Sequence, residues 1–193
     1  MDSKNNIRHI LAIIACIVPL FYLAYVWDML PVDHTPLHFG ADGKPDRYGN
    51  RIGVIIPVAV VSIVSIFTYL LMVNIHKIDP KRTKEGKSPK FDTIGGGIVL
   101  FMMALNLVII MNTVNPETNY LDKAVMPLLG LLFAFLGNMM YNIKPNYFAG
   151  VRIAWTLADD ENWKKTHRLT GGLWFLGGIG IAVTALLVSG KSV

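Results

Sequence analysis

Long apolar runs separated by short polar stretches dominate the pattern of this chain. Five runs of about twenty residues carry almost no charge, at residues 10–30, 54–75, 93–114, 124–142 and 169–189. A helix of about 20 apolar residues is long enough to cross the hydrocarbon core of a bilayer. The pattern therefore predicts an all-α fold, a polytopic bundle of about five transmembrane helices that forms one integral membrane domain over residues 1–193.

Composition agrees with a membrane protein. Hydrophobic residues make up 53% of the chain and charged residues 16%, whereas soluble domains carry about 25% charged residues. The single cysteine, Cys16, excludes a disulfide within the chain and a cysteine-based metal site. The first apolar run is too long for the core of a signal peptide, so we expect a retained first span.

The distribution of Lys and Arg predicts the orientation of the helices. If the N-terminus is cytoplasmic, thirteen of the eighteen Lys and Arg residues fall on the cytoplasmic side, six of them in residues 76–92. Such a bias follows the positive-inside rule. The prediction places the C-terminus and the loop at residues 31–53 outside, and the stretch at residues 137–172 inside. The net charge of +5 is explained in the same way and does not indicate direct nucleic-acid binding.

The stretch at residues 137–172 mixes glycine, proline, asparagine, aromatic residues and dense charge. Thr156 has the character of a helix N-cap, with acidic residues three to five positions on and basic residues up to Arg168. This charge order complements the dipole of a helix. We therefore predict a short cytoplasmic helix over residues 157–168 that lies along the membrane interface.

Several residues of this stretch are candidates for binding a partner or a ligand. Arg152 keeps its charge and needs an anion or carbonyl groups as partners. A lipid headgroup, a carboxylate at Asp159 or Asp160, and a specific ligand all remain open for it. For His167, a structural hydrogen-bonded role is the alternative to ligand binding. The full set of candidates is Asn138, Asn146, Arg152, Trp155, Thr156, Trp163, His167 and Arg168.

The outer loop holds a second set of candidates, with metal binding as one interpretation. These residues are His34, His38, Asp42 and Asp46. Pro36 lies between the two histidines and opposes a helical metal-binding pair. His34 and His38 are therefore weak candidates for metal ligands. A compact hydrogen-bonded loop packed on the helix ends is the other interpretation. We expect turns and short extended pieces here, with one turn at residues 43–46.

A small-molecule or metal-dependent membrane transporter or enzyme is therefore one functional hypothesis. The outer-loop residues would supply its site, with Asn106 and Asn138 as contacts inside the membrane. Transporters usually carry charged residues deep in their spans. No Asp, Glu, Lys or Arg lies deep in any of the five runs, and this weakens the hypothesis. A third hypothesis is that the chain is a structural subunit of a larger assembly.

Two sets of residues together carry a family resemblance. The first set is Gly137-Asn138, Lys144-Pro145-Asn146-Tyr147-Phe148, Gly150, Arg152, Trp155-Thr156-Leu157, Asn162-Trp163, Thr166-His167-Arg168 and Gly171-Gly172. The second set is Pro36, His38-Phe39, Gly43, Pro45-Asp46 and Tyr48. The first set resembles the SdpI family of bacterial membrane proteins. The second resembles the N-terminal domain of unknown function often found in that family. Ala154 departs from the pattern, because proline is frequent there.

The resemblance implies a multi-pass protein of the bacterial inner membrane without an enzymatic activity and without cofactors. Its partners would be the lipid bilayer, a secreted toxic peptide outside and a regulator protein in the cytoplasm. The implied function is immunity to the peptide, signalling to the regulator, or both. Residues 31–53 would face the peptide, and residues 137–172 would face the regulator.

Overall fold

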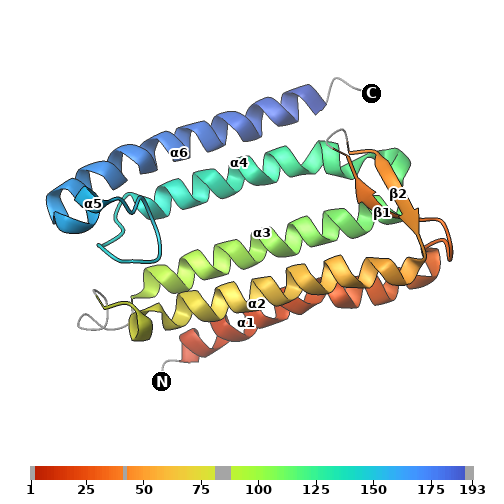
Figure 1. The fold of residues 1–193 in the computed structure, drawn as a ribbon, viewed down its shortest axis with the longest axis horizontal. Helices are drawn as coiled ribbons and strands as arrows, with labels where there is room; N and C mark the ends of the chain where they lie inside the picture. Colours follow the sequence, from red (N-terminus) through yellow and green to blue (C-terminus); the bar gives the residue numbers. More distant parts are fainter. Residues whose placement is uncertain (1–2, 41–42, 81–87, 190–193) are drawn as a thin grey trace.

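Five long helices that run side by side make up most of the chain (Figure 1). The computed structural model describes residues 3–40, 43–80, 88–189. The long helices are α1 (Ser3–Tyr25), α2 (Ile55–Ile78), α3 (Pro89–Val114), α4 (Tyr120–Met140) and α6 (Asp160–Ser189). Each is long and apolar enough to cross a membrane. The predicted all-α polytopic bundle is confirmed.

The bundle has two ends with different structures. One end carries a β-hairpin, β1 (Thr35–Phe39) and β2 (Pro45–Gly49), and we call it the hairpin end. The other end carries the N-terminus and the connector, which we define as residues 141–159 between α4 and α6, and we call it the loop end (Figure 1). The connector includes the short helix α5 (Ala154–Ala158). Three 3-10 turns complete the elements: η1 (Trp27–Met29), η2 (Arg51–Val54) and η3 (Pro116–Thr118).

The helices pack as a group of three and a pair. Helices α1, α2 and α3 all contact one another, while α6 packs on α4, which in turn packs on α3 (Figure 1). Inside the group of three, Asn106 Nδ2 donates to Val58 O at 3.1 Å and to Ser62 Oγ at 3.3 Å. Asn106 is 1% exposed. These hydrogen bonds join α3 to α2 and give the Asn106 amide partners inside the bundle.

Small residues let α4 and α6 approach closely. A Cβ atom at Gly137 would lie 2.5 Å from the backbone nitrogen of Phe175, and one at Gly178 would lie 2.4 Å from that of Ala134. Glycine at such positions permits backbone contact between membrane helices. On α4, Gly130 and Gly137 both face the backbone of α6. Asn138, which follows Gly137, is exposed.

The predicted separate helix over residues 157–168 is wrong. Leu157 belongs to α5, and Asp160 begins α6, which continues without interruption through Arg168 to Ser189. Asp159 divides the two helices, because its backbone is extended (φ −134°, ψ 120°). Its Oδ1 accepts from Glu161 N at 2.7 Å and from Asn162 N at 3.2 Å. Asp159, and not Thr156, is therefore the N-cap of this helix.

The hairpin lies where turns and extended pieces were predicted. Its strands are antiparallel, and Thr35 pairs with Gly49. The turn predicted at residues 43–46 is wrong in its second half, because Pro45 and Asp46 belong to β2. Gly43 has φ +72°, and a Cβ atom there would lie 2.2 Å from Asn119 Oδ1. The tip of the hairpin therefore rests on Asn119, immediately before α4.

The contact between α4 and α6 can be tested at one glycine. We expect Gly137→Ala to destabilise the protein by about 1–3 kcal/mol, the usual effect of overpacking, because its new methyl group would meet the backbone of α6. Gly177→Ala is the matched control, since nothing lies within 4 Å of a Cβ atom there. The measurement is the midpoint of thermal unfolding in detergent. Equal midpoints for the two variants would contradict the close approach.

Candidate functional site

The connector is held together by side chains that bind its own backbone. Asn146 is fully buried. Its Oδ1 accepts from Phe148 N at 2.9 Å and from Ala149 N at 2.6 Å. Its Nδ2 donates to Lys144 O and to Ala149 O, both at 3.0 Å. The side-chain amide thus uses both donors and both acceptor positions to shape the turn after Pro145.

Trp163 and His167 join the start of α6 to the connector. Their rings stack with centroids 3.9 Å apart and planes 19° apart, and each side chain is 1% exposed. Trp163 Nε1 donates to Ile143 O at 2.9 Å. His167 Nδ1 donates to Trp163 O at 2.8 Å, and its Nε2 accepts from Val151 N at 3.0 Å. Since a carbonyl only accepts and an amide only donates, His167 is the neutral Nδ1–H tautomer.

Gly150 and Thr156 fix the path of the connector around His167. Gly150 has φ +108°, and a Cβ atom there would lie 2.2 Å from His167 Nε2. Thr156 is fully buried. Its Oγ1 accepts from Ile153 N at 3.0 Å and donates toward Val151 O at 2.8 Å. These contacts use the Thr156 hydroxyl and His167 Nε2 within the chain.

Two residues from other helices anchor the connector to the bundle. Asp79, at the C-terminal end of α2, is fully buried, and its Oδ2 accepts from Tyr147 N at 2.7 Å. Lys90, in the first turn of α3, donates from Nζ to Asn142 O. No sequence pattern pointed to Asp79. It lies 68 residues from its partner and next to a basic stretch, where a carboxylate is expected to be solvated.

The eight predicted residues of the C-terminal region divide into a buried and an exposed group. Those with their polar atoms used inside the chain are Asn146, Thr156, Trp163 and His167. The exposed residues are Asn138, Arg152, Trp155 and Arg168. The bonds of the buried group are those that a structural role requires. Among the eight, the exposed side chains are the ones within reach of a partner.

The exposed group is amphipathic. Trp155 is 64% exposed, and Tyr147 and Ile153 are also exposed. Arg152 Nη1 donates to Tyr147 O, so its partner in the structure is a carbonyl and not the carboxylate of Asp159 or Asp160. We call Tyr147, Arg152, Ile153 and Trp155 the connector patch. Aromatic rings beside a cation suit the membrane interface and also suit a protein contact.

At the hairpin end, His34 and His38 have different partners. His38 Nδ1 donates to Asp46 Oδ1 at 2.6 Å, and both side chains are more than half exposed. The His34 ring instead stacks on Tyr48, with centroids 4.2 Å apart. Asp42 lies outside the described residues. Among the residues that are described, no three His, Cys, Asp or Glu side chains form a group that could hold a metal ion.

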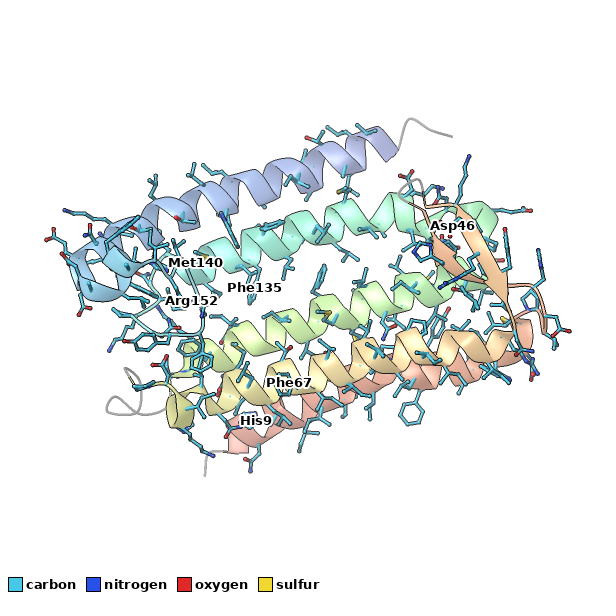
Figure 2. All side chains as sticks on the ribbon, viewed as in Figure 1. His9, Asp46, Phe67, Phe135, Met140 and Arg152 are labelled. Atoms are coloured by element: carbon cyan, nitrogen blue, oxygen red, sulfur yellow. The ribbon has the colours of Figure 1, made fainter. Side chains whose placement is uncertain are left out.

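The two sets of candidates are far apart. Figure 2 shows Asp46 on the hairpin and Arg152 on the connector at opposite ends of the bundle. Behind the connector lies a cavity of about 300 Å³ whose walls come from α2, α3, α4, α6 and the connector, with Met72, Phe148 and Trp174 among its apolar lining residues. The structure thus has a hairpin, a bundle and a connector in series, and the candidates that it describes at the two ends do not contact one another.

Comparisons with known protein families match two regions of the chain. The SdpI/YfhL protein family matches residues 142–193, which hold the connector and α6. A domain of unknown function, DUF1648, matches residues 14–61, which hold the hairpin. Both matches agree with the resemblance to the SdpI family that the sequence motifs indicate. The chain is also 22% identical to the immunity protein SdpI of Bacillus subtilis (strain 168) over 181 residues, which cover 94% of this chain and 81% of that protein. No solved structure matches the chain.

The structure explains much of what makes the SdpI match recognisable. The matched residues include Asn146, Gly150, Trp163 and His167, each of which has a defined task in folding the connector. Arg152 and Trp155 lie in the same matched region, but their side chains are exposed. The SdpI motif therefore describes a way to fold this connector, with a few exposed positions carried on it.

The role of Asn146 can be tested with a substitution of nearly equal shape. Asn146→Asp replaces Nδ2 with an oxygen that faces Lys144 O and Ala149 O. We expect a loss of about 1–3 kcal/mol in stability, since buried groups lose their partners. The measurement is the thermal midpoint together with hydrogen exchange of the amides at residues 148–151.

Asn162→Asp is the matched control for this test. Asn162 is exposed in the first turn of α6, where a carboxylate complements the helix dipole. If Asn146→Asp were as stable and as protected as the control, the amide would not organise the connector.

Proposed function

We propose that this chain is an immunity protein that protects a bacterium from a secreted toxic peptide and signals its presence to a cytoplasmic regulator. The observation that carries the proposal is the similarity to the immunity protein SdpI, which extends over 94% of this chain. The chain would act by binding, without a chemical step and without a cofactor. This function requires a surface outside, a surface inside and a bundle that joins them.

The arrangement of the two ends supports this proposal. The hairpin projects from one end of the bundle and presents the exposed pair His38 and Asp46 to any molecule arriving from that side. The connector patch lies at the other end and presents Trp155 and Arg152. In the proposal the peptide acts on the hairpin end and the regulator docks on the connector patch. Exposed Trp and Arg side chains are common energetic centres of protein interfaces.

Orientation in the membrane is part of the proposal. The connector and the first turns of α6 carry Lys144, Arg152, Lys164, Lys165 and Arg168. The positive-inside rule therefore favours a cytoplasmic loop end and an external hairpin end. The chain would then lie in the inner membrane with its N-terminus in the cytoplasm and its C-terminus outside.

The signal between the two ends would be a change in helix packing. Coupling requires two states of the bundle that the two ligands bind with different affinity. The contact between α4 and α6 supports such a change. Glycines at the contact have no side chains that would have to repack when one helix shifts against the other. The connector follows α4 directly, so a shift of α4 against α6 would move the connector patch.

Single cysteines test the orientation. In a Cys16→Ala background, Arg47→Cys is expected to react with a membrane-impermeant maleimide in intact cells. Lys164→Cys is expected to react only after the cells are opened. Both parent side chains are exposed in the structure, so either cysteine is reachable from its own side. The opposite labelling pattern would reverse the proposed topology and with it the assignment of peptide and regulator.

A survival assay tests the immunity function. Expression of the chain in a bacterium sensitive to a secreted toxic peptide is expected to raise survival above that of the empty vector. The proposal fails if cells with the chain in their membrane survive no better than cells without it.

The connector patch can be tested separately, in cells whose survival rises when they express the chain. Trp155→Ala is expected to weaken binding of the cytoplasmic regulator roughly tenfold or more, the loss typical of an interface hot spot, while the amount of protein in the membrane stays unchanged. The readout is the fraction of regulator recovered with the membrane. Tyr25→Ala is the matched control, because Tyr25 is an exposed aromatic at the hairpin end of α1. Equal recovery for the two variants would place the docking surface elsewhere.

A further inference from the structure

A groove along α3 takes no part in the proposed immunity function. It begins near the loop end as a cavity of about 390 Å³ between α1, α3 and α4. A second cavity of about 290 Å³ continues it between α3 and α4, and the two cavities share Gly97, Leu100 and Phe135. The groove is therefore long, and it runs in the direction of the membrane helices.

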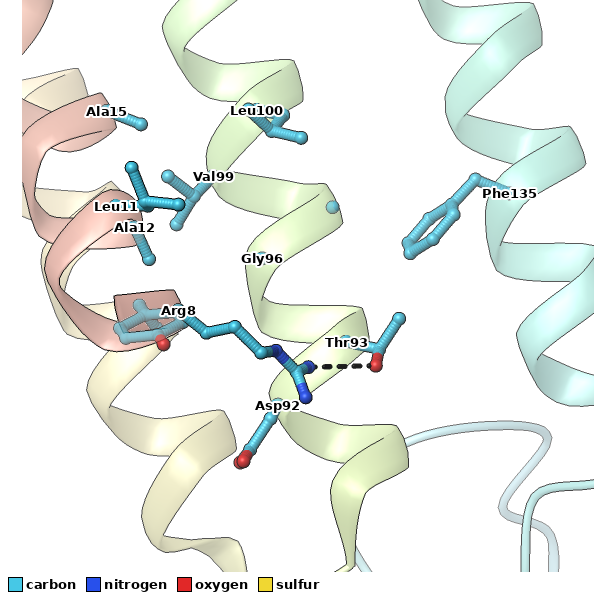
Figure 3. A pocket seen from close by; sticks show the side chains of 12 residues that line it. Arg8, Leu11, Ala12, Ala15, Asp92, Thr93, Gly96, Val99, Leu100 and Phe135 are labelled. Carbon is cyan, nitrogen blue, oxygen red and sulfur yellow. Dashed lines mark hydrogen bonds between the residues drawn. The ribbon is translucent and has the colours of Figure 1, made fainter. Parts of the chain in front are cut away.

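The mouth of the groove is polar and cationic. Arg8, which is exposed on α1, reaches across to α3, where its Nη2 donates to Thr93 Oγ1 at 3.2 Å (Figure 3). The guanidinium of Arg8 has five N–H donors, so further donors remain for a ligand. Asp92 also lines this cavity, but its side chain is buried, at 7% exposed.

Beyond the mouth the groove is apolar. The walls of the first cavity include Leu11, Ala12 and Leu100, with Phe135 facing them from α4 (Figure 3). Its floor includes Gly96, where nothing lies within 4 Å of a Cβ atom. The second cavity is lined by Gly97, Leu100, Phe101, Ala104, Leu128, Leu131, Leu132 and Phe135. The guanidinium of Arg8 therefore lies at one end of an apolar groove that suits a hydrocarbon chain.

We propose that this groove binds one anionic phospholipid from the leaflet at the loop end. The phosphate lies on Arg8 and the Thr93 hydroxyl, and an acyl chain lies along α3 past Gly96. Basic pockets between transmembrane helices recognise anionic headgroups in this way, and the planar guanidinium of Arg suits phosphate oxygens.

The headgroup contact is tested by lipid titration of the purified full-length chain. Native mass spectrometry counts bound phosphatidylglycerol and phosphatidylcholine. Arg8→Gln is expected to weaken phosphatidylglycerol binding about fivefold and to leave phosphatidylcholine binding unchanged. Arg47→Gln is the matched control, because it removes the same charge from the exposed hairpin at the other end.

The acyl-chain contact is tested by filling the groove. Gly96→Leu places a side chain in open space beside α3, so it is expected to leave the fold intact and to abolish retention of phosphatidylglycerol. Gly177→Leu on α6 is the matched control, since that position is equally open but lies outside the groove. Inorganic phosphate is added as a competitor and is expected to displace no lipid.

Three results would overturn the proposal. The first is equal phosphatidylglycerol affinity for Arg8→Gln and Arg47→Gln, and the second is equal retention for Gly96→Leu and Gly177→Leu. The third is displacement of the lipid by inorganic phosphate, which would make the mouth a site for free phosphate. If Gly96→Leu does not fold, the pair of arginine variants decides the question alone. Survival under peptide challenge is measured separately, so failure of one proposal leaves the other standing.

Discussion

Satisfying an irregular backbone at the edge of a membrane bundle is the constraint on which the loop end depends. Helices satisfy their own amides, but the connector from α4 to α6 includes backbone outside helices at residues 141–153. Buried backbone groups without partners are costly, and more so next to a bilayer. Asn146 and Thr156 meet this need from within the connector. His167 meets it from α6, and Asp79 meets it from the end of α2. Their hydrogen bonds explain why so polar a stretch contains so many buried side chains.

This constraint also determines how the bundle is joined. Helices α4 and α6 meet through glycines and touch backbone to backbone, and α6 has little contact with α1, α2 or α3. The connector is bound to both groups, through Trp163 at the start of α6 and through Asp79 at the end of α2. Movement of the pair α4 and α6 against the other three helices would therefore be transmitted through the connector.

The sequence predicted what depends on local pattern. Apolar runs predicted the five long helices, and glycine and proline predicted the irregular outer loop. The failures arose where the folded structure decides between competing local hydrogen bonds. Thr156 has the character of an N-cap, but its hydroxyl binds Val151 O and Ile153 N, and Asp159 caps the helix instead. The helix was expected to begin anew near residue 169, but Gly171 packs on α4 and α6 passes through without a break.

The sequence singled out the connector as a candidate site, because aromatic and charged residues are unusual in a spacer. It could not separate residues that fold the connector from residues exposed on it, because both groups have the same polar and aromatic composition. Asp79 could not be predicted either, because only the folded chain brings it to Tyr147.

The division between buried and exposed residues changes how the family motif should be interpreted. A long motif suggests a long binding site, yet Asn146, Gly150, Trp163 and His167 are all used by the fold. Proteins that share these residues would therefore share the connector without necessarily sharing a partner. Specificity for a partner would instead come from side chains that the connector leaves exposed, and Trp155 is the largest of those in the connector patch. Differences in function among relatives should then follow the exposed positions, while the buried motif reports the fold.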